Sequence, residues 1–134
     1  MRGTFKKWII RITATLFILF FALLVAVELM IGYGARKTCR MAQDLFPGDR
    51  VSALIAVVEC ESCDILNRNH AVWALGMLSD QRALPVLEKY YTGGPCDHPR
   101  KICQYELEKA LKLLRNDNNY NAVLWRWMLP RETS

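Results

Sequence analysis

One apolar stretch near the amino terminus constrains this 134-residue chain more than any other feature. Of the 26 residues from Trp8 to Tyr33, 21 are hydrophobic. A helix of that length spans about 39 Å, which is enough to cross a hydrocarbon core of about 30 Å with some tilt. Trp8 and Tyr33 stand where interfacial aromatic residues usually lie. We therefore predict one transmembrane helix, with residues 1–35 as a membrane anchor and residues 8–33 in contact with the lipid bilayer.

A cleaved signal peptide is the alternative to an anchor. The apolar run is longer than a signal peptide's usual apolar core of about 7 to 15 residues. The clearest small-x-small sequence, residues 32–34, is a weak cleavage site. The pattern favours an uncleaved signal anchor.

The charges flanking the apolar stretch predict its orientation. The net charge is +5, and residues 1–34 carry four basic side chains and one acidic one. The basic residues Arg36, Lys37 and Arg40 on the other flank oppose this excess without exceeding it. The amino terminus is therefore expected in the cytoplasm and the remainder outside it, in the periplasm if the protein is bacterial.

The remaining 108 residues have an ordinary soluble composition, with 49 hydrophobic residues. Their apolar residues recur at spacings of three and four, which indicates helices. We expect a juxtamembrane helix or linker over residues 36–48, stopped by Pro47 and Gly48, and a helical domain over residues 49–130. The helices of that domain are expected near residues 50–59, 67–78, 81–91, 99–115 and 120–128, with Asp49 and Asp80 as amino-terminal caps. The residues expected to face inward are Val51, Leu54, Ile55, Val58, Ala71, Ala74, Leu75, Leu78, Leu84, Leu87, Tyr91, Ile102, Leu107, Ala110, Leu111 and Leu114.

An internal repeat is visible in this helical part. The segments 74–78 and 110–114 are similar and lie 36 residues apart, as do Cys60 and Cys96. A period in the thirties in helix–turn–helix units is typical of an α-solenoid. The predicted fold class is all-α, a short α-solenoid of helical pairs preceded by one transmembrane helix.

Residues 73–87, WALGMLSDQRALPVL, carry a family resemblance. They resemble the short HEAT-like repeat named after phycobilisome lyases, and the resemblance is specific over residues 66–93. In it Ala74 and Gly76 let the paired helix approach closely, Asp80 caps the second helix, and Arg82 is solvated. Arg68 stands where family members often carry an arginine, and Ser79 replaces the family's turn glycine.

The resemblance implies a role in binding other proteins. A minority of the family act as lyases or isomerases on bilin–protein linkages, so a bilin lyase-like enzyme is one alternative. About two repeats remain once the anchor is set aside, which suits a docking surface better than an enclosed active site. We therefore predict a membrane-anchored interaction or assembly module, with no enzyme activity and no cofactor.

The five cysteines allow two further hypotheses, a disulfide and a zinc site. Stacked loops one repeat apart would let Cys63 or Cys60 form a disulfide with Cys96, within the required Cα separation of about 7 Å. Cys103 is a further disulfide candidate. The same stacking would let Cys60, Cys63, Cys96 and either Cys103 or His98 bind zinc, which is the basis of a second alternative, a small zinc- or thiol-dependent module.

The remaining cysteine features predict little chemistry. Cys39 is expected to pack on a short helix, to be lipidated, or to pair with another chain. The Cys60–Cys63 CxxC motif follows a helix carboxyl end, the wrong end to stabilise a catalytic thiolate, so redox catalysis is not expected.

Several functions are not expected because the sequence lacks the motifs that they require. Phosphate-binding and metalloprotease motifs are missing from the sequence, and no catalytic residues are predicted. Basic residues do not cluster as a nucleic-acid footprint requires, so no nucleic-acid partner is expected.

Trp125, Arg126 and Trp127 are the candidate contact residues. Side chains two apart on a helix diverge by about 200°, so only one tryptophan can point inward.

Overall fold

The computed structural model describes residues 2–97 and 100–116. Within them the fold is all-α, as predicted, with five α-helices, one 3-10 helix and no strand. The expected helix at 120–128, the contact candidates Trp125, Arg126 and Trp127, and His98 lie outside the described residues. The chain divides into two compact units, residues 1–33 and residues 34–134.

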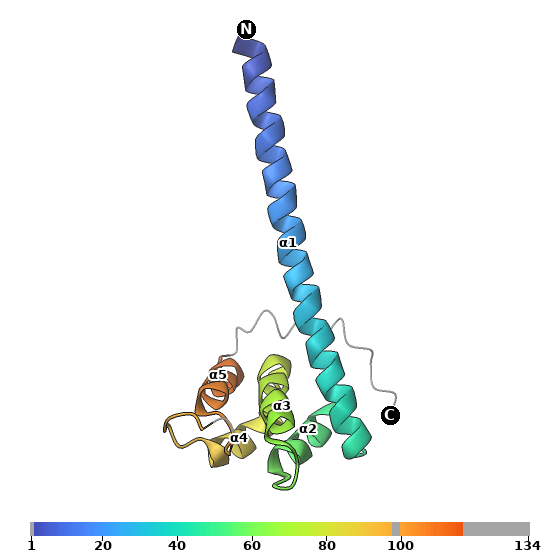
Figure 1. Ribbon diagram of the computed structural model, residues 1–134, viewed down its shortest axis with the longest axis vertical. Coiled ribbons are helices and arrows are strands. Elements are labelled where there is room, and N and C mark those ends of the chain that lie inside the picture. Colours follow the sequence, from blue (N-terminus) through green and yellow to red (C-terminus); the bar gives the residue numbers. More distant parts are fainter. Residues whose placement is uncertain (1, 98–99, 117–134) are drawn as a thin grey trace. The chain divides into compact units, whose positions relative to one another are not determined.

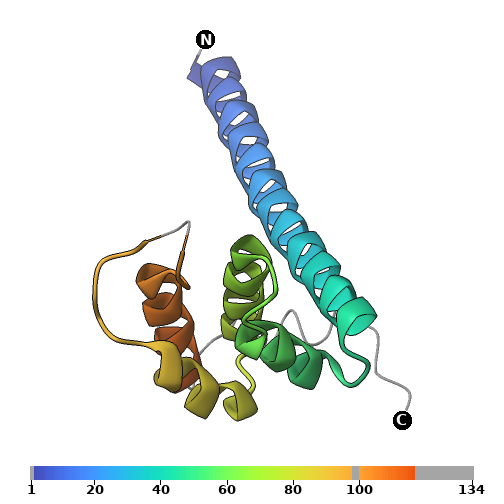
Figure 2. The ribbon, with the colours of Figure 1, turned by 60° about the horizontal axis from the view of Figure 1, so that its bottom comes forward.

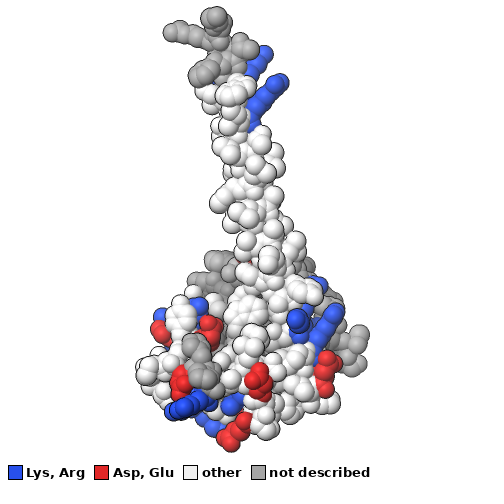
Figure 3. All heavy atoms as spheres, in the orientation of Figure 1, with Lys and Arg blue, Asp and Glu red and all other residues white. Residues whose placement is uncertain are grey.

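The first helix, α1, runs from Arg2 to Leu45 (Figure 1). Its stretch from Lys6 onward is long and apolar enough to cross a membrane, and its apolar side chains are exposed. On the face shown in Figure 3, its middle carries no charged side chain. A single membrane span or signal anchor therefore fits this helix.

The expected separate juxtamembrane helix is instead the last part of α1. Because no proline stands between Arg2 and Pro47, nothing in the sequence breaks the helix before Leu45. Gly48 follows with a φ of 152°, a conformation that favours glycine. Cys39 and Ala42 are buried in the core of the second unit, so residues 36–45 are part of that unit rather than a free linker.

The second unit continues with α2 (Arg50–Glu59), α3 (Ile65–Leu78), η1 (Gln81–Ala83), α4 (Leu84–Tyr90) and α5 (Gln104–Arg115). Both predicted caps are confirmed. The Asp49 carboxylate accepts from the Ser52 amide at 3.4 Å, and the Asp80 carboxylate accepts from the Arg82 amide at 3.0 Å. α5 begins at Gln104, later than the expected residue 99, because residues 100–103 are not helical.

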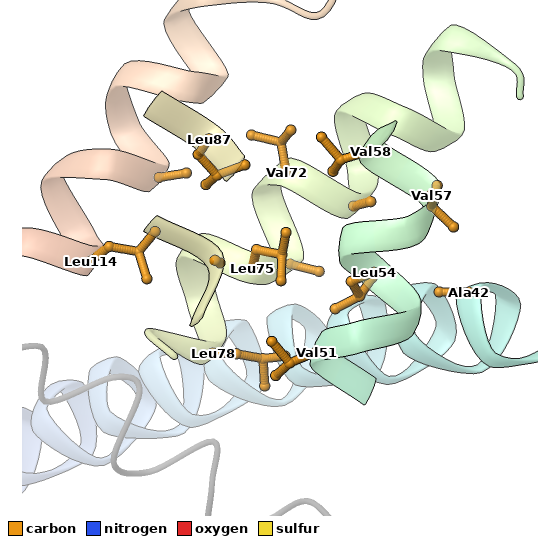
Figure 4. Packing of buried hydrophobic residues seen from close by; sticks show 14 of the residues in the cluster. Ala42, Val51, Leu54, Val57, Val58, Val72, Leu75, Leu78, Leu87 and Leu114 are labelled. Carbon is orange, nitrogen blue, oxygen red and sulfur yellow. The ribbon is translucent and has the colours of Figure 1, made fainter. Parts of the chain in front are cut away.

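The core lies where α3 is held between α2 and α5 (Figures 1 and 2). Figure 4 shows Leu75 and Leu78 of α3 pointing into the same cluster as Val51 and Leu54 of α2. The predicted inward residues confirmed as buried are Val51, Leu54, Val58, Ala71, Ala74, Leu75, Leu78, Leu87, Ile102, Leu107, Ala110, Leu111 and Leu114. Thirteen of the sixteen expected positions are therefore buried, whereas helical periodicity did not predict the fully buried Val57 and Val72.

Three expected core positions lie elsewhere. Tyr91 is 37% exposed, because α4 ends at Tyr90 and Tyr91 is its cap with extended backbone. Ile55 and Leu84 are half-buried and pack against the rim of the cluster.

Candidate functional site

Three hollows in the second unit share one side chain, the half-buried Trp73 of α3. The first holds about 380 Å³, the second about 440 Å³ and the third about 340 Å³. We call them together the Trp73 groove. Its lining residues come from the end of α1, from α3 and from α5; they are Gly34, Lys37, Thr38, Met41, Leu66, Asn67, Asn69, His70, Trp73, Met77, Cys103, Glu106, Lys109, Ala110, Lys112 and Leu113.

The helical period of α3 places Trp73 in this groove. The buried residues Ala71, Ala74, Leu75 and Leu78 turn one face of α3 into the core. Trp73 and Met77 are four residues apart, so they lie one above the other at the edge of that face, and both are half-buried.

A glycine of α1 leaves room for the indole. A Cβ added to Gly34 would lie 3.4 Å from Cη2 of Trp73, which is an ordinary van der Waals contact. The indole therefore packs against the α1 backbone on one side and lines the hollows on the other.

Charged side chains lie at the edge of the groove, with three lysines against two glutamates. Lys109 contacts Glu106 at 3.9 Å and lies over the Tyr105 ring at 4.1 Å. Lys112 is bonded to Glu108 at 2.6 Å, and this hydrogen bond raises the lysine's pKa. Lys37 completes the basic edge. The groove therefore combines an apolar floor with an edge of three lysines, two of which are paired with glutamates.

Arg68 connects three helices of the second unit. Its Nε and Nη2 donate to the carbonyl of Val58 at 2.9 and 2.7 Å, and its guanidinium lies 5.7 Å from the centre of the Tyr90 ring. Val58 is in the last turn of α2, where carbonyls lack a partner within the helix. Arg68 thus joins the end of α2 to α3 and to α4.

Arg82 is exposed to solvent, as expected, and it also pairs with two carboxylates. It pairs with Asp49 at 2.9 Å and with Asp80 at 3.1 Å. The hydrogen bond from Ser52 lowers the pKa of Asp49, with a smaller contribution from Arg82. The bonds to Asp80 and Asp49 raise the pKa of Arg82.

The cysteines pair differently from the expected link between stacked loops. Cys60 and Cys63 form a disulfide with each other, with a Cα–Cα distance of 5.3 Å. Cys96, the expected partner of one of them, is exposed and unpaired. Cys60 caps the end of α2 and Cys63 stands two residues before α3, so the short turn between these helices brings them together without any contribution from the next loop.

A zinc site is not assembled in the described residues, where no group of three or more metal-ligating side chains comes together. Bonded to each other, Cys60 and Cys63 offer no thiolates to a metal ion. The Cys96 sulfur instead lies at the start of α5, where it accepts a hydrogen bond from the amide of Tyr105, two residues after Cys103.

Sequence reasoning missed the groove, although its signal was present. Trp73 was read as part of a repeat motif, whereas its spacing of four from Met77 placed both on one side of α3. The contribution of Leu113 from α5 depends on how two helices distant in the sequence pack, which periodicity does not reveal.

Comparison of the chain with protein-family models, with curated protein sequences and with solved structures finds no match.

Proposed function

We propose that this protein is a membrane-anchored helical docking module that binds another protein through the Trp73 groove. The observation that supports the proposal is the meeting of three hollows at one half-buried tryptophan, with Met77 and Leu113 beside it. Large apolar side chains around a tryptophan are typical of sites that carry much of a binding energy. In this proposal the paired helices α3, α4 and α5 are a short HEAT-like solenoid, as the sequence resemblance implies.

The groove favours one class of partner. Its floor is apolar, and its edge has lysines at positions 37, 109 and 112 against the carboxylates of Glu106 and Glu108. Charge complementarity steers and selects partners at such an edge. The partner is therefore a protein segment with an apolar face flanked by acidic residues, bound as an amphipathic helix binds a groove.

The docking unit is proposed to lie outside the cytoplasm. The basic amino-terminal flank supports this orientation. The Cys60–Cys63 disulfide adds support, because structural disulfides persist in exported proteins and are rare in cytosolic ones.

Two matched charge variants test the proposal. Met77→Glu places a carboxylate in the groove, whereas Pro85→Glu places one on the exposed first turn of α4. The tagged full-length chain and each variant are purified from native membranes in mild detergent, and co-purifying proteins are quantified by mass spectrometry. We expect one protein whose recovery falls at least tenfold with Met77→Glu and is unchanged with Pro85→Glu.

The same proteins in equal amounts in all three samples would contradict the proposal. Circular dichroism melting of the two variants is the folding control, because a loss of partner counts only if Met77→Glu melts close to the wild type.

A further inference from the structure

Two unpaired cysteines meet at the start of α5. All five cysteines lie in the described residues, and of the three outside the disulfide Cys96 alone is exposed. Cys103 is the residue that caps α5 and is only 1% exposed. The backbone amide of Tyr105, in the first turn of α5, donates to Cys96 Sγ at 3.3 Å. The Cys96 sulfur therefore lies at the amino end of this helix, beside Cys103.

The surroundings give the two thiols different reactivities. The hydrogen bond from Cys103 lowers the pKa of Cys96, and the amide of Tyr105 lowers it further. A helix amino end stabilises a thiolate in the same way. Burial raises the pKa of Cys103, which stays a thiol and is shielded from solvent.

We propose that Cys96 and Cys103 are a disulfide-forming pair, in which Cys96 reacts first with a small disulfide donor and Cys103 then completes a second disulfide in the domain. In the first step the Cys96 thiolate attacks one sulfur of the donor, the donor's S–S bond breaks, and one donor thiolate leaves. The released thiolate takes the proton of Cys103. The Cys103 sulfur then attacks the Cys96 sulfur, and the second donor thiolate leaves. Two protein thiols are oxidised and one donor disulfide is reduced to two thiols.

The second disulfide would fix the loop before α5. The amide of Cys103 already donates to the Asn69 side chain at 2.8 Å, and the Gln104 side chain accepts from the amide of Thr92 at 2.7 Å. These bonds hold Cys103 and its neighbour against α3 and the loop, while Cys96 stays exposed. Cys103 also lines the Trp73 groove, but formation of this disulfide is tested without any binding partner.

The test uses the full-length chain in detergent, unreduced so that the Cys60–Cys63 disulfide is kept. The protein is treated with oxidised glutathione, quenched with acid, alkylated and digested, and the cysteine peptides are identified by mass spectrometry. We expect the wild type to yield peptides joined through Cys96 and Cys103. Cys103→Ser should accumulate glutathione on Cys96 at least tenfold above the wild type, and Cys96→Ser should leave Cys103 without glutathione.

Glutathione retained on Cys96 in the wild type, at the level of Cys103→Ser, would overturn the proposal. A link from Cys96 to Cys60 or Cys63 would overturn it as well. The wild-type linkage is decisive even if a variant fails to fold, and glutathione found on the buried Cys39 reports unfolding in each sample.

Discussion

Gly76 of α3 lies directly against Ala110 of α5: a Cβ added to Gly76 would stand 2.8 Å from the Ala110 Cα and 2.9 Å from its Cβ. Such distances are shorter than van der Waals contact, so only glycine permits this helix crossing. The sequence resemblance implied a close approach at Gly76, but of the paired helix expected over residues 81–91. The helix that approaches is α5, which follows α4 in the chain, rather than α4 itself. This contact sets the position of Lys109 and Leu113 relative to Trp73 in the groove.

Gly76→Ala should therefore destabilise the second unit. Overpacking of a tight contact typically costs about 1 to 3 kcal/mol, and here it exceeds the helix-propensity gain of about 1 kcal/mol. We expect a lower free energy of unfolding in denaturant titrations of the full-length chain. Gly34→Ala is the matched control, because its Cβ would meet only Trp73 at 3.4 Å. Equal stability of the two variants would show that α3 and α5 do not cross as described.

Ser79 adopts a left-handed conformation at the end of α3, with φ of 47° and ψ of 42°. Its hydroxyl donates to the carbonyls of Gly76 and Leu113 at 3.1 and 3.3 Å. Ser79→Gly and Ser79→Ala both lose these bonds, but only alanine keeps the steric cost of a left-handed residue. We expect Ser79→Gly to be more stable than Ser79→Ala by about 1 kcal/mol in thermal melts. Alanine as stable as glycine would mean that this residue is not left-handed.

Arg68→Met should destabilise the unit more than Arg82→Met. Arg68 is half-buried and satisfies the carbonyl of Val58 with two donors, and a lost charged hydrogen bond costs about 1.5 to 3 kcal/mol. Arg82 has 57% of its side chain exposed, and exposed ion pairs contribute little because water screens them. Chemical denaturation of the two variants compares them directly. A larger loss for Arg82→Met would contradict the role of Arg68 at the end of α2.

The lowered pKa of Asp49 predicts how stability depends on pH. Because its pKa is lower in the folded chain than in the unfolded one, its contribution is present above the unfolded value and is lost as pH falls through the folded value. Asparagine is an equally good amino-terminal cap that does not titrate. We expect Asp49→Asn to lose less stability than the wild type between about pH 5 and pH 2. Identical pH profiles would show that Asp49 has no lowered pKa.

Local patterns predicted the parts of the fold that depend on neighbouring residues. The caps at Asp49 and Asp80 followed from residue type and position, and the buried face of α3 followed from helical spacing. Local sequence patterns did not predict the cysteine pairing or the Trp73 groove. The distance between two loops depends on helix packing far along the chain, so Cys96 was assigned a partner it does not have. Helical spacing also failed to predict where α4 ends. The helix stops at Tyr90, so Tyr91 lies outside the core.

A photo-reactive amino acid at position 77 tests the docking groove most directly. It is introduced into the full-length chain in native membranes, with position 85 on exposed α4 as the matched control. We predict a light-dependent adduct with one protein from position 77 and none from position 85, attached to an apolar segment flanked by acidic residues. Equal adducts from both positions, or adducts from position 77 only with lipid, would contradict the account.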